Sequence, residues 1–239
     1  MNGATDRARP RCMPAAARLA HGLAPALGLL ATLSAASAWA LPMASQGSVM
    51  VMAERSPDER ELAANFALTA RDALGGAVGR WHEPMGHGSA MRAHEREYAA
   101  LTYTRLLRRW NLPHAQANLW FVGMLGEVRA HALPDTRTLW SPALLADYET
   151  TRIYFGAGIE PMRARGLRHD TVYARAGFSF YQAEYDEMQP WFILQAKRTR
   201  WGMDAKSELT PMLRVIHRRF FFELGGNDNG AQVNLMLSY

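Results

Sequence analysis

Side chains that can bind a metal ion are concentrated in one polar stretch, WHEPMGHGSAMRAHE, at residues 81–95. Imidazole and thioether groups suit copper, and neutral imidazole also suits zinc and nickel. The spacing matches no fixed metal signature, so a polar loop that happens to contain histidines is the simpler interpretation. The hypothesis of a metal-handling surface protein names five candidate ligands: His82, Met85, His87, Met91 and His94.

Nucleophilic catalysis needs a nucleophile, a base and an orienting acid that lie close together. Two sets of residues contain these groups: Ser179 with His169 and Asp170, and Ser207 with Glu208 and His217. Neither set has the spacing of a recognisable triad, and the sequence contains no G-x-S-x-G turn. We therefore expect no catalytic site, no cofactor and no enzymatic activity.

The elements that carry these residues show a hydrophobic period of two from about residue 138 onward, which is typical of strands between an apolar and a polar medium. In DTVYARAGFSFYQAEYD, residues 170–186, the even-numbered positions from Val172 to Phe180 are apolar. Thr171, Tyr173 and Arg175 lie on the other side. The same alternation recurs at 152–160, 192–197, 208–215 and 220–224.

Charged residues fall repeatedly on the polar side of these segments. On a soluble β-sandwich, which is the alternative fold, they would be solvated; in a barrel they would point into the lumen. The candidate lumen-lining residues are Arg152, Arg175, Lys197, Arg214, Glu223 and Asp147. The basic ones predict a small channel for anionic or polar solutes. The alternative is that acidic residues pair with them and plug the lumen.

Aromatic residues near the predicted strand ends favour a membrane barrel, because amphipathic rings sit at membrane interfaces. Read back from the C-terminus, short and long connections tend to alternate, as in outer-membrane barrels. Residues 161–169 and 199–207 are expected as longer external loops, and 185–189 as a short periplasmic turn. The sequence thus predicts an all-β, antiparallel up-and-down transmembrane barrel of about twelve strands.

One stretch offers a ten-stranded alternative. Ser56, Pro57 and Glu59 form a helix N-terminal signature, and Leu62 and Phe66 follow at helical spacing. A helix over residues 57–74 would remove a pair of strands. The same residues also alternate with period two, which favours two strands and a turn.

The N-terminus predicts export. Four arginines (Arg7, Arg9, Arg11 and Arg18) precede an apolar stretch, residues 23–33, and an A-x-A site that ends at Ala40. We expect residues 1–40 to be a signal peptide and 41–239 to be the barrel. Without this leader, 23 basic residues (27 − 4) face 21 acidic ones (22 − 1), which argues against nucleic-acid binding.

The C-terminal nonapeptide AQVNLMLSY places Val233, Leu235, Leu237 and Tyr239 on one face of the last strand. It resembles the C-terminal signal of Gram-negative outer-membrane β-barrels. Segments such as TARDALG (69–75) and ARAGFSFY (174–181) are similar to parts of a poorly characterised group of proteobacterial exported barrels. The resemblance implies the outer membrane, with its assembly machinery, membrane lipid and lipopolysaccharide as partners. The functional alternatives are a small channel, a non-conducting structural barrel, the metal-handling protein and a lipid-modifying enzyme.

Overall fold

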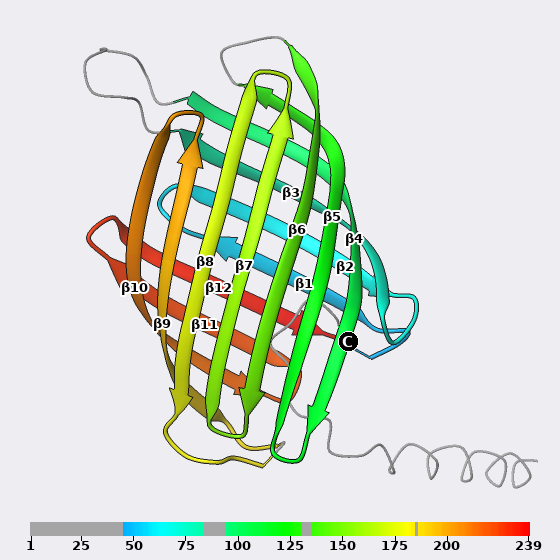
Figure 1. Ribbon diagram of the computed structural model, residues 1–239, viewed down its shortest axis with the longest axis vertical. Coiled ribbons are helices and arrows are strands. Elements are labelled where there is room, and N and C mark those ends of the chain that lie inside the picture. Colours follow the sequence, from blue (N-terminus) through cyan, green and yellow to red (C-terminus); the bar gives the residue numbers. More distant parts are fainter. Residues whose placement is uncertain (1–44, 84–93, 131–134, 185) are drawn as a thin grey trace, which may run out of the picture. The chain divides into compact units, whose positions relative to one another are not determined.

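The computed structural model describes residues 45–83, 94–130, 135–184 and 186–239, which form one antiparallel sheet (Figure 1). Its twelve strands are β1 (Val49–Arg55), β2 (Glu59–Ala67), β3 (Asp72–Glu83), β4 (His94–Leu112), β5 (Ala115–Ala130), β6 (Thr136–Thr150), β7 (Ile153–Ala164), β8 (Leu167–Ser179), β9 (Gln189–Trp201), β10 (Asp204–His217), β11 (Phe220–Asn227) and β12 (Gly230–Ser238). The predicted metal ligands Met85, His87 and Met91 and the predicted signal peptide lie outside the described residues.

Each strand pairs with its neighbours in the sequence, and β1 pairs with β12 to close the sheet into a barrel. The closing register places Val51 opposite Leu237 and Arg55 opposite Val233. We call the end where β1 begins and β12 finishes the terminal end, and the opposite one the loop end. The prediction of an antiparallel up-and-down barrel with twelve strands is confirmed.

The helical alternative for residues 57–74 does not form, because this stretch is the β2–β3 hairpin. The helix-capping signature has a different use here. The Ser56 hydroxyl accepts a hydrogen bond from the Glu59 amide at 3.1 Å, and the Ser56 amide donates to the Glu59 carbonyl at 2.7 Å. A capping bond of the kind that starts a helix therefore closes the β1–β2 turn.

Three connections differ from the prediction. The expected longer loops at 161–169 and 199–207 are two-residue turns, built on Gly166 and Gly202 with φ of 68° and 57°. The expected short turn at 185–189 belongs instead to the nine-residue connection 180–188 between β8 and β9. Charged residues interrupt the apolar alternation near the loop end, while backbone pairing continues past them.

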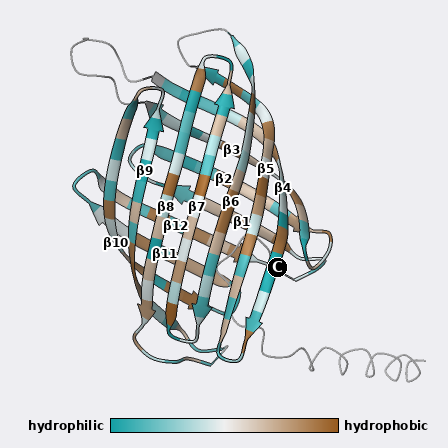
Figure 2. Cartoon of the chain, viewed as in Figure 1, coloured by the Kyte–Doolittle hydropathy of each residue, from teal (hydrophilic) through white to brown (hydrophobic). Residues whose placement is uncertain are grey.

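The predicted apolar faces point away from the lumen. Leu101 is 74% exposed, Leu125 61% and Leu209 59%, whereas the residues next to them along each strand are buried or half-buried. Hydrophilic residues gather in the upper parts of β8 and β9 in Figure 2. Within the described ranges no helix is long and apolar enough to cross a membrane. The outer wall thus carries an apolar belt on a sheet that has no open edge.

Candidate functional site in the barrel lumen

A buried ion pair occupies the lumen where β10 and β11 lie side by side. The register sets Arg214 directly opposite Glu223. Arg214 Nε donates to Glu223 Oε1 at 2.8 Å, and the two residues are only 1% and 0% exposed. The other oxygen, Oε2, accepts from Asn234 Nδ2 at 2.9 Å and lies 3.6 Å from Arg175 Nη1. Glu223 is therefore shared by two guanidinium groups and one amide.

Aromatic rings complete the surroundings of Arg214. Its guanidinium carbon lies 4.3 Å from the ring centroid of Tyr154 and 5.0 Å from that of Phe221. Cation–π contacts of this length stabilise a desolvated guanidinium. The charge of Arg214 is consequently enclosed by one carboxylate and two aromatic faces, with no room for bulk water.

Side-chain hydrogen bonds extend this cluster across the lumen. Arg175 Nε donates to Gln195 Oε1 at 2.6 Å, and Gln195 Nε2 donates to Gln232 Oε1 at 3.2 Å. Gln232 Nε2 then donates to Glu54 Oε1 at 3.2 Å. The chain links β8, β9, β12 and β1, so it ties the closing strand pair to the opposite part of the wall.

A cavity of about 300 Å³ lies next to this network. Five carboxylates line it, from Glu54, Glu59, Glu61, Glu160 and Glu223, against the cations of Lys197 and Arg175. Glu61 accepts a hydrogen bond from the Tyr98 hydroxyl. Acidic groups therefore outnumber basic groups around the cavity, although the sequence drew attention to the bases.

Apolar side chains fill the lumen toward both ends. At the loop end the largest members of the packed cluster are Trp81, Tyr98, Leu139 and Trp201, and Leu139 is completely buried. A second cluster lies toward the terminal end and includes Trp191, Ile193, Ile216 and Phe221. The cavity and the ion pair thus lie between two apolar layers.

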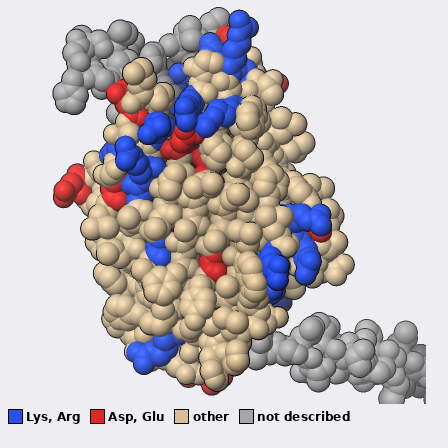
Figure 3. All heavy atoms as spheres, in the orientation of Figure 1, with Lys and Arg blue, Asp and Glu red and all other residues tan. Residues whose placement is uncertain are grey.

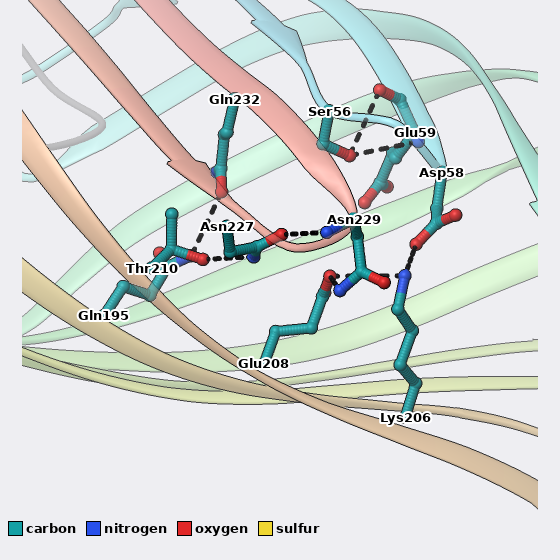
Figure 4. Close-up of polar contacts among 10 residues, drawn as sticks. All are labelled: Ser56, Asp58, Glu59, Gln195, Lys206, Glu208, Thr210, Asn227, Asn229 and Gln232. Atoms are coloured by element: carbon teal, nitrogen blue, oxygen red, sulfur yellow. Dashed lines mark hydrogen bonds and ion pairs between the residues drawn. The ribbon is translucent and has the colours of Figure 1, made fainter.

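A network of hydrogen bonds and ion pairs at the loop end holds the short β11–β12 hairpin in place (Figure 4). Asn227 Nδ2 donates to Thr210 Oγ1 at 2.7 Å, and Asn229 Nδ2 donates to Glu208 Oε1 at 2.8 Å. Lys206 forms ion pairs with Glu208, at 3.2 Å, and with Asp58 of the β1–β2 turn. Thr210 is only 2% exposed, so the hairpin tip contacts a residue of the lumen side of β10.

The structure brings some of the predicted lumen residues together and separates others. Arg175, Lys197 and Glu223 line the cavity, and Arg214 is paired to Glu223 beside it. Asp147 is buried elsewhere, accepting from Asn118 Nδ2 at 2.8 Å and Trp120 Nε1 at 2.9 Å.

Arg152 does not lie in the lumen. It is exposed in the turn between β6 and β7 and donates to the carbonyl oxygens of Ser179 and Phe180, each at 3.3 Å. Arg152 was correctly placed on the polar side of the alternation, but β7 begins one residue after it, at Ile153. The side chain therefore anchors the neighbouring connection instead of lining a pore.

The candidate catalytic residues are far apart on β8. Ser179 donates to the Tyr181 carbonyl at 2.6 Å near the terminal end. His169 is packed near the loop end, with its ring 5.1 Å from that of Trp81 and 5.9 Å from that of Trp201. Ten residues of strand separate them by roughly 33 Å, because a strand rises about 3.3 Å per residue. They cannot act together.

The metal hypothesis is left without a described site. His82 lies on β3, where its amide donates to the Asp58 carbonyl at 2.8 Å, and His94 begins β4. In the ranges that the structure describes, no cluster of histidine, cysteine and acidic residues could hold a metal ion.

Sequence reasoning missed most of the acidic lining. β1 reads VMVMAER and is apolar on both faces up to Ala53, so parity could not show that Met50, Met52 and Glu54 face the lumen. Glu61 could have been found, because it shares parity with Glu59 and Asn65, and Glu160 shares parity with Tyr154 further along β7.

Comparison with models of known protein families finds no match, and comparison with curated proteins finds none either. Among solved structures, a KdgM porin aligns over 80% of this chain and 98% of its own, with 10% identity and a TM-score of 0.46. KdgM porin in complex with disordered oligogalacturonate has the same coverage and identity, with a TM-score of 0.45. LpxR from Salmonella typhimurium covers 80% of this chain and 99% of its own, with 7% identity and a TM-score of 0.44.

Proposed function

We propose that the protein is an integral β-barrel of the bacterial outer membrane that does not conduct solutes and serves as a structural barrel of the cell envelope. The apolar belt on a closed sheet supports a membrane location, because only a sheet without edges satisfies its backbone hydrogen bonds in lipid. The predicted signal peptide and C-terminal assembly signal agree with the outer membrane.

The observation that carries the non-conducting function is the burial of the Arg214–Glu223 pair. In a water-filled pore, charged side chains of the lumen contact water. Here both residues of the pair are at most 1% exposed, and apolar clusters lie toward either end of the barrel. Side chains therefore occupy the path that a solute would take.

Single-channel recording tests this proposal. The protein is refolded in detergent, inserted into planar lipid bilayers in KCl at about 1 M, and compared with an open porin. At this salt concentration small currents are well separated from noise, and charges are screened within roughly 3 Å. We expect no stepwise current from the wild type or from Arg175→Glu. Regular conductance steps from the wild type would contradict a closed lumen.

A gated channel is the second candidate, and the cavity is the observation that favours it. If the β11–β12 hairpin moved outward, the cavity would present five glutamates and two cations to a solute. Such a pore would select cations, because charged rings set the selectivity of a channel. In a KCl gradient, currents from this pore would give a cation-selective reversal potential, which the double substitution of Glu54 and Glu160 by glutamine would reduce.

The membrane location has a separate test. Membranes from cells that express the full chain are separated on a sucrose gradient, and the barrel is identified by its heat-dependent mobility on a denaturing gel. We expect the folded form in the outer-membrane fractions. Recovery of the folded chain in the soluble periplasmic fraction would refute the proposed location.

A further inference from the structure

Arginines gather on the outer wall at the loop end of β7, β8 and β9. Side chains of this sector that point away from the lumen are Arg163, Arg168, Arg198 and Arg200, with Asp170 as the one carboxylate among them. Figure 3 shows basic side chains gathered over the upper part of this face, with an acidic patch among them. The sector therefore has a surplus of positive charge.

Two of these arginines have no protein partner in the part of the chain that the structure describes. Asp170 is engaged by Arg163 Nη1 and, at 2.7 Å, by Arg168 Nε. Arg200 lies opposite Asp170 and Arg198 opposite Val172 in the β8–β9 register, yet neither forms an ion pair or side-chain hydrogen bond there. Both side chains are exposed. Their guanidinium groups are available to an anion.

The position of the pair relative to the apolar belt identifies the kind of anion. Moving from Arg198 toward the middle of the wall, the next outward residues are Ala196 and Leu194, and Val172 lies opposite on β8. Trp140, 51% exposed, lies opposite Arg163 on β6. The arginines thus lie where hydrocarbon gives way to lipid headgroups, which is also where aromatic residues are enriched in membrane barrels.

Another sector at the same end has a different charge balance. On β3, β4 and β5 the outward residues are Arg80 and Arg129 with Glu95, Glu97 and Glu127. Arg80 is paired with Glu95 at 2.7 Å and with Glu97 at 3.4 Å. Carboxylates neutralise this part of the wall. The surplus on β7–β9 is therefore a local feature of that sector.

We propose that Arg198 and Arg200 bind the phosphate groups of lipid A in the outer leaflet. Guanidinium groups bind phosphate oxygens through paired, charge-assisted hydrogen bonds, and the acyl chains of the same molecule would lie on the apolar residues beneath. This inference rests on the proposed outer-membrane location and names the lipid that one side of the barrel recognises.

Titration of the refolded protein in zwitterionic micelles tests the proposal. The probes are bisphosphorylated lipid A, the same lipid without phosphates, and inorganic phosphate, with the Kd measured by native mass spectrometry. We expect tight binding of the bisphosphorylated lipid alone. The double variant R198Q/R200Q should weaken it by about 10- to 30-fold, since each basic residue near a charged lipid surface contributes roughly 1 kcal/mol.

The matched control is R80Q/R129Q, which removes the same number of charges from the same end of the barrel and should change the Kd by less than about twofold. Heat-dependent gel mobility confirms that each variant is folded. Equal binding of both lipids, equal losses in the two double variants, or competition by inorganic phosphate at the lipid concentration would overturn the proposal. Each of these results leaves the membrane location untouched, because fractionation decides that separately.

Discussion

Arg214 and Glu223 face each other across β10 and β11 with Nε and Oε1 2.8 Å apart, and both are excluded from solvent. A buried ion pair gains little over a well-packed apolar pair, but it becomes costly when one partner is removed. The pair therefore makes the lumen intolerant of single charge changes. It also offers a direct measure of how dry the interior is.

Removing the shared carboxylate should destabilise the barrel strongly. In Glu223→Gln, two guanidinium groups lose their counter-charge, and we expect a loss of about 3–5 kcal/mol in the free energy of unfolding. The measurement is urea unfolding of the protein refolded in lipid vesicles, followed by tryptophan fluorescence. The double variant R214M/E223L should recover part of the loss, because it removes the buried charge of Arg214 together with its partner, while Arg175 still lacks its counter-charge.

Glu97→Gln is the control for that experiment. It removes one carboxylate from an exposed pair with Arg80 at 3.4 Å, and we expect less than about 1 kcal/mol. A Glu223→Gln effect no larger than that of the control would mean that water reaches the lumen pair.

A charge in the middle of the apolar belt should lower the free energy of unfolding strongly. Leu101 is 74% exposed on the outer face of β4, so Leu101→Arg places a guanidinium in hydrocarbon. The expected cost is about 2–4 kcal/mol for a central position of a membrane barrel. Met203→Arg adds the same side chain in the fully exposed β9–β10 turn and should be nearly neutral. Vesicle refolding and urea titration of both variants would show whether lipid touches Leu101.

Close approach of β4 and β5 requires a glycine at position 126. A Cβ there would overlap the carbonyl oxygen of Ala99 and the Cα of Ala100, whereas the nearest atom to a Cβ at Gly76 is 3.5 Å away. We expect Gly126→Ala to destabilise the barrel by about 1–3 kcal/mol, as overpacking does, and Gly76→Ala to change little. The comparison of their unfolding midpoints in urea is decisive, since each variant adds one methyl group to the sheet.

A substitution at the last residue, Tyr239, should affect the assembly of the barrel but not its stability. Tyr239 exchanges backbone hydrogen bonds with Val49, at 2.9 and 3.3 Å, while the residue remains 65% exposed. We therefore expect Tyr239→Ala to leave the unfolding free energy of the refolded barrel nearly unchanged. If the C-terminal face of Val233, Leu235, Leu237 and Tyr239 is an assembly signal, the same variant should reduce the amount of assembled barrel in cells. Normal amounts of assembled barrel would count against that signal.

The strands and their outward faces could be predicted because one physical pattern, apolar alternation against lipid, persists along most of the chain. The ends of the strands could not be predicted from this pattern. Arg163, Arg168, Arg198 and Arg200 interrupt the alternation at the loop end, so the sequence suggested loops where pairing continues to two-residue turns. The apolar alternation shows only the part of each strand that faces hydrocarbon. Backbone hydrogen bonding continues beyond it and sets the full length of the strand.

The sequence predicted which side chains point into the lumen, but it did not predict which of them pair with each other. Parity placed Arg214 and Glu223 on the inner face. Their direct opposition depends on the register of the β10–β11 hairpin, whose tight turn contains Arg218 at a φ of 53°. Glu54 lies on a strand that is mostly apolar on both faces, so its direction became visible only when β1 was paired with β2 and β12.

The seam between β1 and β12 joins the part of the barrel that is synthesised first to the part that is synthesised last. Until the final strand arrives, the growing sheet has two free margins whose amide and carbonyl groups find no partner in hydrocarbon. Partial insertion, strand by strand, would leave these groups unsatisfied at every stage. The chain must therefore enter the bilayer nearly whole, or be held meanwhile by a protein surface that occupies both margins and releases them together.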